Sequence, residues 1–128
     1  MTAPVPAWPA AYIRVASAGT EHDLTVQHQQ HAALRAAAER GWPPSALYTD
    51  AGVSGWQRPG PALTRLSDAI SSSQHDAVIT QDAARISRNP AHVEAFARHC
   101  ADRGAALEFL HGGTLDPGTL ALHSDITG

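Results

Sequence analysis

The sequence predicts an α/β fold, a three-layer αβα sandwich around a mainly parallel central sheet. Short apolar segments typical of buried strands alternate along the chain with segments whose apolar residues recur at helical spacing. The helical segments are long enough to be crossover connections between parallel strands, which are right-handed in nearly all proteins. A length of 128 residues suits one domain with a substantial core.

Four short segments have the composition of strands. They are AYIRVA at 11–16, SALYTD at 45–50, DAVIT at 76–80 and AALEFL at 105–110. The third is apolar over most of its length, which favours a strand that is buried on both faces of the sheet.

Three longer segments have the composition of helices, at 23–41, 61–70 and 89–104. The first ends at Gly41 before a Trp-Pro-Pro sequence, the second has Pro61 in its first turn, and the third ends at Gly104, which are ordinary helix boundary signals. The last two each have an apolar face, formed by Leu63, Leu66 and Ile70 in one and by Val93, Phe96 and Cys100 in the other.

The bulk composition excludes several classes of protein. The formal charge is −3 and all nine basic residues are arginine, so the chain has no broad basic surface, and DNA contact would need a local arginine cluster or an added module. Cys100 is the only cysteine, which excludes an internal disulfide and a cysteine-rich zinc site. Residues 1–10 are expected to form a flexible leader without the features of a signal peptide. With no run of membrane-spanning length either, we expect a cytoplasmic protein with no membrane partner.

A candidate site is expected where the parallel strands end, because ligands of such sheets bind outside the carboxyl ends of the strands. The fold brings the stretches 14–17, 49–58, 81–88 and the chain from His111 onward to this edge. Guanidinium groups bind phosphate oxygens in bidentate fashion and stay charged at any relevant pH. The basic residues of this edge are Arg14, Arg58, Arg85 and Arg88. We expect the first, third and fourth to converge on an anion; solvated loop arginines paired with carboxylates are the alternative.

Other polar residues accompany the arginines. They are Gln27 on the first helix, Asp50, Ser54 and Asp82. No acidic triplet has the spacing of a metal site, so the arginines would have to replace metal ions, and no cofactor is expected. His28 and His31 lack a third ligand and are interpreted as surface residues.

Four motifs together resemble the catalytic domain of the serine recombinases, the resolvase/invertase family. They are YIRVAS at 12–17, the glutamine at 27, YTDAGVSGWQRPG at 48–60 and RISRNP at 85–90. The resemblance runs from Tyr12 to about Leu110 and implies a resolvase-like catalytic domain over 11–111. The turn-rich tail at 112–128 would then end before the dimer helix and DNA-binding module of the family. Such a domain is expected to bind DNA weakly and to dimerise poorly when alone. The protein partner that the resemblance implies is a second copy, in a homodimer, or a full-length recombinase, in a heteromer.

The resemblance also implies a mechanism that needs no metal or nucleotide. A serine hydroxyl attacks a DNA phosphodiester, becomes linked to the 5′ phosphate and frees a 3′ hydroxyl, and the reaction reverses after strand exchange. Arg14, Arg85 and Arg88 would hold the scissile phosphate, and Arg58 would assist from the glycine-rich loop. The residues that would order the site are Gln27, Asp50 and Ser54.

The sequence departs from the family pattern at two positions. Ala16 occupies the position of the nucleophile, and Ser17 follows it. Ser17 could serve only if the strand has ended or bulges there, because neighbouring side chains of a strand point to opposite faces; a strand-end hydroxyl without a role is the alternative. Ala84 occupies the position of an acid, for which Asp82 could partly substitute. The sequence therefore predicts a site-specific DNA recombinase catalytic domain. Its alternative is a degenerate, non-catalytic relative that binds or regulates a full-length recombinase, or a mobile-element remnant.

Overall fold

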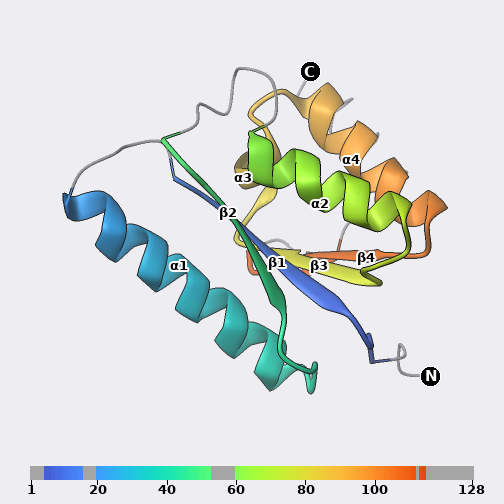
Figure 1. Cartoon of the computed structure of the whole chain (residues 1–128), viewed down its shortest axis with the longest axis horizontal. Coiled ribbons are helices and arrows are strands. Elements are labelled where there is room, and N and C mark those ends of the chain that lie inside the picture. Colours follow the sequence, from blue (N-terminus) through green and yellow to red (C-terminus); the bar gives the residue numbers. More distant parts are fainter. Residues whose placement is uncertain (1–4, 16–19, 53–59, 112, 115–128) are drawn as a thin grey trace.

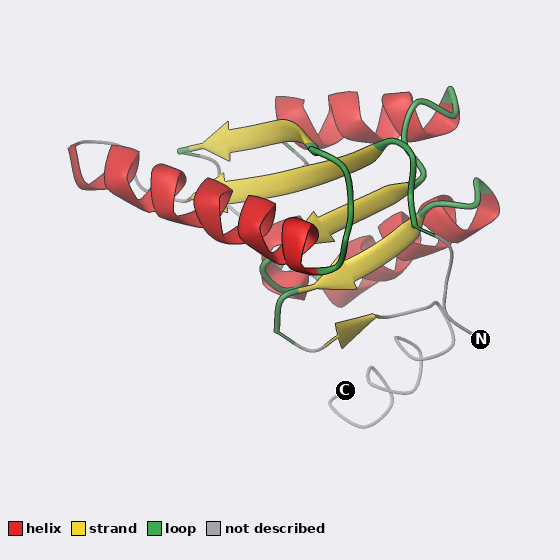
Figure 2. Cartoon of the chain, turned by 90° about the horizontal axis from the view of Figure 1, so that it is seen from below, coloured by secondary structure: helices red, strands yellow, loops and turns green. Residues whose placement is uncertain are grey.

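The central sheet of the computed structural model has the strand order β2-β1-β3-β4-β5. The structure describes residues 5–15, 20–52, 60–111 and 113–114. The elements in chain order are β1 (Pro9–Val15), α1 (Thr20–Glu39), β2 (Ala46–Ala51), α2 (Pro61–Ser71), β3 (Ala77–Thr80), α3 (Ala83–Ile86), α4 (Pro90–Asp102), β4 (Ala106–Phe109) and β5 (Gly113–Thr114). The first four strands run parallel, with α1 on one face of the sheet and α2 and α4 on the other (Figures 1 and 2). The predicted αβα fold is confirmed.

Strand β1 lies inside the sheet and is the centre of the core. All seven of its residues are buried, and their side chains alternate between the two faces. Ala10 and Tyr12 belong to the larger apolar cluster with α2 and α4, whereas Ala11 and Ile13 pack in a smaller cluster against α1. The predicted apolar faces of α2 and α4 are buried in the larger cluster, Cys100 included. None of the described helices has the length and apolar character needed to cross a membrane.

The first strand begins earlier than its composition indicates. It starts at Pro9, inside the segment interpreted as a leader, because the Asp76 carboxylate accepts hydrogen bonds from the backbone N–H groups of Ala7 (2.7 Å) and Trp8 (2.8 Å). The carbonyl of Trp8 also accepts a hydrogen bond from the backbone N–H of Asp76 at 3.2 Å. These contacts attach the chain before β1 to the start of β3.

Two short elements were not predicted. Helix α3 follows β3 directly and has a single turn, too short for helical periodicity to show. Its signal in the sequence is Asp82, which is the N-cap: its carboxylate accepts a hydrogen bond from the backbone N–H of Arg85 at 3.2 Å. Strand β5 lies in the tail that was predicted to have no element, and pairs antiparallel with β4 through Thr114 and Glu108. With only two residues, one of them a glycine, β5 is too short to show the alternating pattern of a strand.

Stability is expected to fall above about pH 9. Burial raises the pKa of the Cys100 thiol to about 12 from an ordinary 9.0. Burial and the hydrogen bond to Asp50 raise the pKa of Tyr12 above its usual range. The folded protein therefore keeps protons that the unfolded chain loses, and each group costs up to about 1.4 kcal/mol per pH unit once the unfolded chain has ionised. Urea unfolding at pH 8, 9.5 and 11 tests this: Cys100→Ala should have a shallower dependence on pH than the parent, and an equal slope would contradict the assignment.

Candidate functional site

The site lies where the direction of the chain through the sheet reverses. Strand β1 has β2 on one side and β3 on the other, so connections leave this point toward opposite edges of the sheet. The carboxyl ends of strands at such a point leave a crevice that ligands of α/β folds occupy. Arg14 lies at the end of β1, and residues 81–85 follow β3, so the two stretches lie at this switch point.

Arg14 is joined to α3 through its guanidinium group. Its Nε donates to the backbone carbonyl of Arg85 at 2.9 Å, and its Nη2 donates to the carbonyl of Ala84. The residue is only 3% exposed, and both bonds are partly buried. Helix α3 is a single turn whose last carbonyls have no partner within the helix, and Arg14 satisfies two of them.

The side chain of Arg85 in turn contacts the end of β1. Its Nη1 donates to the backbone carbonyl of Arg14 at 3.2 Å, and its Nε donates to Oε1 of Gln81 at 3.1 Å. Gln81 in turn is fixed to the turn after β4, because its carbonyl accepts from the backbone N–H of His111 at 3.0 Å. Gln81 belongs to the stretch 81–88 that the sequence predicts at this edge, but no role was predicted for it. Its position four residues before Arg85 was the signal that it could reach that side chain.

The cluster is electropositive. Burial lowers the pKa of Arg14 from its ordinary value, and the nearby charges of Arg85 and Arg88 lower it further, while Asp82 acts in the opposite direction. Like charges held close together cost free energy unless an anion lies between or beside them. The structure thus brings Arg14 and Arg85 into direct contact, with Arg88 exposed and near enough to affect Arg14 electrostatically.

Asp50 has a structural position next to this cluster. It pairs with Arg14 in the register of β1 and β2 and is 2% exposed. Its carboxylate accepts three hydrogen bonds, from the Tyr12 hydroxyl at 2.7 Å and from the backbone N–H groups of Ala62 (2.8 Å) and Leu63 (3.0 Å). Asp50 therefore caps the N-terminus of α2 from a neighbouring strand, where a negative charge is favourable.

Gly60 makes room for that carboxylate. A Cβ atom built at this position would lie 2.5 Å from Cγ of Asp50, closer than real contacts allow. The last residue before α2 must therefore be a glycine for Asp50 to reach the helix. Close packing against Asp50 thus explains why the Arg-Pro-Gly sequence before α2 ends in a glycine.

The remaining predicted site residues fall into two groups. Gln27 is exposed on α1 and makes no hydrogen bond to another described residue; three positions on, Gln30 donates to the hydroxyl of Thr49 at 3.2 Å. Asp82 lies past the end of β3 and caps α3, where its carboxylate accepts from the backbone N–H of Arg85. Outside the described residues lie Ala16, Ser17, Ser54 and Arg58.

The donor set of the site suits an anion. Among the described residues no three histidine, cysteine, aspartate or glutamate side chains are grouped to hold a metal ion. The groups gathered at the switch point are the guanidinium groups of Arg14 and Arg85 and the side-chain amide of Gln81. Beside them lies the N-terminus of α3, which the Asp82 carboxylate caps. Such groups can bind and orient a phosphate without supplying a nucleophile themselves.

Several solved structures have the same fold. The N-terminal catalytic domain of TP901-1 integrase superposes with a TM-score of 0.80 at 24% identity, covering 93% of both chains. A resolvase family site-specific recombinase from Streptococcus pneumoniae gives 0.71 at 21% identity, covering 94% of this chain and 87% of that one. The catalytic domain of ISC1926 TnpA, an IS607-like serine recombinase, gives 0.72 at 18% identity, covering 93% and 78%. No curated protein sequence matches the chain.

The family model for the resolvase N-terminal domain matches residues 10–124, which is nearly the whole chain. The matched range contains every element of the sheet except the first residue of β1, and both arginines that meet at the switch point. The chain therefore belongs to the resolvase family, as a resolvase N-terminal domain.

Proposed function

We propose that the chain is the catalytic domain of a site-specific DNA recombinase and that its arginine cluster holds a scissile DNA phosphate. The observation that carries the proposal is the reciprocal contact of Arg14 and Arg85 at the switch point, with Arg88 beside it. In a chain whose formal charge is −3, like charges gathered at one strand end favour an anionic ligand. The structural neighbours named as recombinases and an integrase support DNA as that ligand.

The proposed reaction uses the hydroxyl of Ser17 as the nucleophile. Its oxygen attacks the phosphorus of a DNA phosphodiester, a P–O bond to serine forms, and the bond to the 3′ oxygen breaks. The serine proton leaves to solvent or a base, and the departing oxygen takes up a proton to become a free 3′ hydroxyl. Negative charge on the phosphate oxygens increases in the transition state, and Arg14, Arg85 and Arg88 would stabilise it. The reverse attack by a 3′ hydroxyl on the phosphoserine rejoins the strand.

The expected result of a cleavage trap is a DNA 5′ phosphate attached to Ser17. The chain is fused to a DNA-binding module and incubated with supercoiled DNA that carries the sequences flanking its gene. After denaturation and digestion, mass spectrometry locates the adduct. Arg88→Ala should lower the adduct yield about 10²-fold or more, because removal of one donor to a developing charge has that effect. Arg98→Ala on α4, also exposed, is the matched control and should leave the yield unchanged.

Ser17→Ala distinguishes the proposed nucleophile from neighbouring hydroxyls. If its adduct persists, another residue is the nucleophile. If the parent gives no adduct while Ala16→Ser does, the arginine cluster is competent and the chain itself is not an enzyme.

A second function is favoured by one specific observation. Ala16 occupies the position that the family motif gives to the nucleophile, and an alanine cannot attack phosphorus. A resolvase-like domain without a nucleophile could still bind a full-length recombinase or its DNA and regulate it. The Ala16→Ser result above, with a silent parent, would select this function.

A further inference from the structure

Gln81 joins the end of β3 to α3 through its side chain. The residue follows β3 directly, and its backbone carbonyl accepts a hydrogen bond from the backbone N–H of His111 at 3.0 Å. One residue earlier, the buried Thr80 donates its hydroxyl to the carbonyl of Tyr12 at 2.7 Å. The backbone of Gln81 is therefore held against the sheet, and its side-chain oxygen Oε1 accepts from Nε of Arg85 on α3 at 3.1 Å.

The half-buried guanidinium group of Arg85 has N–H groups that the described residues do not use. A guanidinium group has five N–H donors in a fixed plane. Nε donates to Gln81, and Nη1 donates to the backbone carbonyl of Arg14 at 3.2 Å. To the described residues the group makes no other hydrogen bond and no ion pair, which leaves one N–H on Nη1 and both on Nη2. Two neighbouring nitrogens of this kind can bind two oxygens of one phosphate.

The acceptor that Gln81 supplies is a neutral amide. With the carbonyl of Arg14 it holds the guanidinium group of Arg85 at two nitrogens, which fixes the plane of the group. An amide oxygen compensates less of the guanidinium charge than a carboxylate would. The neighbouring carboxylate of Asp82 accepts from the backbone N–H of Arg85 and not from its side chain. The positive charge of Arg85 is thus fixed in direction and still available to an anion.

We propose that Gln81 is a positioning residue of the arginine cluster. It directs the Arg85 guanidinium group toward the DNA phosphate with a neutral acceptor and leaves the charge of that group for the phosphate. The inference rests on the proposed function, because it takes a DNA phosphate as the anion. The alternative is that Gln81 only attaches α3 to the sheet, in which case the DNA affinity of each variant would follow its stability.

Two substitutions at Gln81 separate these roles. Gln81→Leu is similar in size and removes the acceptor, so both the melting temperature and the DNA affinity should fall. Gln81→Glu keeps an acceptor oxygen for Nε of Arg85 and adds a negative charge. The resulting ion pair should keep the melting temperature at or above that of the parent, whereas the compensated charge should weaken DNA binding. A residue that only attaches α3 cannot produce these opposite changes.

DNA affinity is measured by fluorescence anisotropy on the chain fused to a DNA-binding module. The duplex carries the site of the module next to the sequences that flank the gene, and Arg85→Ala in the same fusion shows what this guanidinium group contributes. Gln81→Leu should raise the dissociation constant at least about threefold, and Gln81→Glu at least about tenfold. The slope of log Kd against log salt concentration should decrease by about 0.9 in Gln81→Glu, which corresponds to the loss of one phosphate contact.

NMR of the arginine side chains tests the contact itself, without DNA. Exchange of the Arg85 Nε–H with water should be faster in Gln81→Leu than in the parent, because the acceptor is gone. In Gln81→Glu the exchange should stay as slow as in the parent. Parent-like exchange in Gln81→Leu would show that Gln81 does not hold Arg85, and would overturn the inference.

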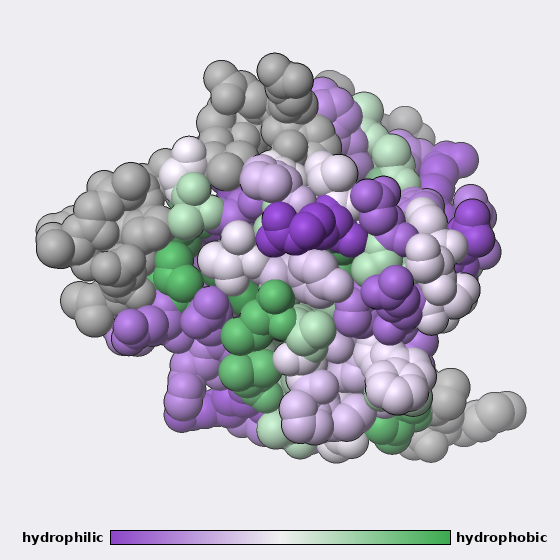
Figure 3. All heavy atoms as spheres, viewed as in Figure 1, coloured by the Kyte–Doolittle hydropathy of each residue, from purple (hydrophilic) through white to green (hydrophobic). Residues whose placement is uncertain are grey.

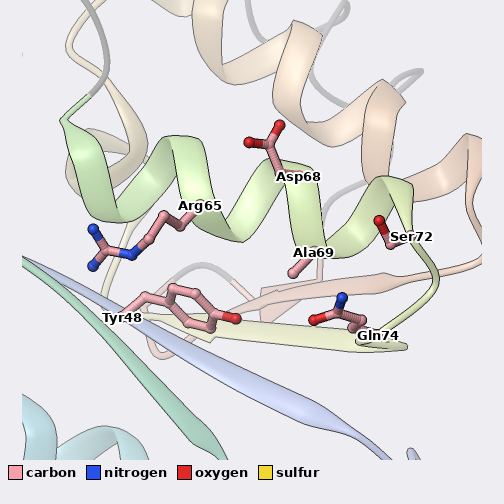
Figure 4. Close-up of a pocket in the computed structure, with 6 residues that line it drawn as sticks. All are labelled: Tyr48, Arg65, Asp68, Ala69, Ser72 and Gln74. Atoms are coloured by element: carbon pink, nitrogen blue, oxygen red, sulfur yellow. The ribbon is translucent and has the colours of Figure 1, made fainter.

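Gln74 is the matched control, because it is a glutamine on the other side of β3 in the chain. Figure 3 shows the face of the molecule over α2, where hydrophilic side chains gather. Gln74 lines a solvent-open hollow of about 390 Å³ on α2 and β2, and Arg65 lies at the opposite end of the same hollow (Figure 4). Gln74→Leu and Gln74→Glu should therefore leave the dissociation constant and the salt dependence unchanged.

The outcomes distinguish this inference from the proposed function. If the parent binds more tightly than Arg85→Ala but both Gln81 variants bind like the parent, the inference is wrong and the proposed function stands. The inference also fails if the affinity of Gln81→Glu follows its melting temperature. Equal affinity of the parent and Arg85→Ala would overturn the proposed function, and this inference with it. If Gln81→Leu does not fold, Gln81→Glu decides alone.

Discussion

Asp50→Ala is expected to lower the free energy of unfolding by roughly 3–5 kcal/mol. The Asp50 carboxylate accepts from the Tyr12 hydroxyl and from two backbone N–H groups of α2, and the residue is 2% exposed. Alanine leaves all three donors buried without an acceptor, and each such donor costs about 1–3 kcal/mol. The carboxylate also joins the N-terminus of α2 to β1 and β2, so its loss weakens the attachment of α2 to the sheet. Chemical denaturation at neutral pH measures the change.

Two further variants rank the contributions. Asp50→Asn retains one acceptor oxygen and should cost less than alanine. Tyr12→Phe removes one donor and frees one carboxylate lone pair, with an expected cost of about 1–2 kcal/mol. Asp68→Ala on the exposed side of α2 is the control and should change stability by less than about 0.5 kcal/mol. A loss below 1 kcal/mol for Asp50→Ala would mean that water or other groups satisfy these donors.

The main elements of the fold could be predicted because their information is local. Apolar periodicity is carried by consecutive residues, and burial then follows, as for Leu63, Leu66 and Ile70 in α2. Helix α3 and β5 are too short to have a period. The early start of β1 depends on Asp76, which is nearly 70 residues away in the sequence. Each of these differences arises from a contact that no local pattern contains.

The sequence was sufficient to predict where the candidate site lies, but not which contacts form it. The rule that parallel strands end at one edge located Arg14 and Arg85 together before any contact was visible. The partners of the Arg14 guanidinium are backbone carbonyls of residues 84 and 85, and every residue type has a carbonyl. Side-chain identity therefore gave no signal of this contact. The same holds for Asp50, whose sequence position suggested a role in the site but whose partners include two backbone N–H groups of α2.

The backbone contacts of Arg14 suggest how the cluster is organised without the acid of the family pattern. Ala84 has no side-chain acceptor, and its carbonyl takes a hydrogen bond from Arg14 instead. A carbonyl carries only a partial negative charge, so this contact compensates less of the guanidinium charge than a carboxylate would. The cluster consequently keeps more positive charge than a carboxylate at this position would leave. We expect both stability and anion binding to depend on how the carbonyls of Ala84 and Arg85 hold the Arg14 guanidinium group.

Arg14→Lys is expected to cost about 2–4 kcal/mol of stability and to abolish the DNA adduct. An ammonium group presents its donors from one nitrogen, whereas the guanidinium group reaches the carbonyls of Ala84 and Arg85 from two nitrogens at once. Arg14 is 3% exposed and its two carbonyl contacts are partly buried, so water replaces the lost donor poorly and the buried charge is less well satisfied. Denaturation and amide hydrogen exchange of α3 measure the effect, and exchange in α3 should increase more than in α4. Arg98→Lys, exposed on α4, should change neither. Parent-like exchange and stability in Arg14→Lys would show that the two carbonyl contacts do not hold α3 to β1, and that the cluster is organised by other residues.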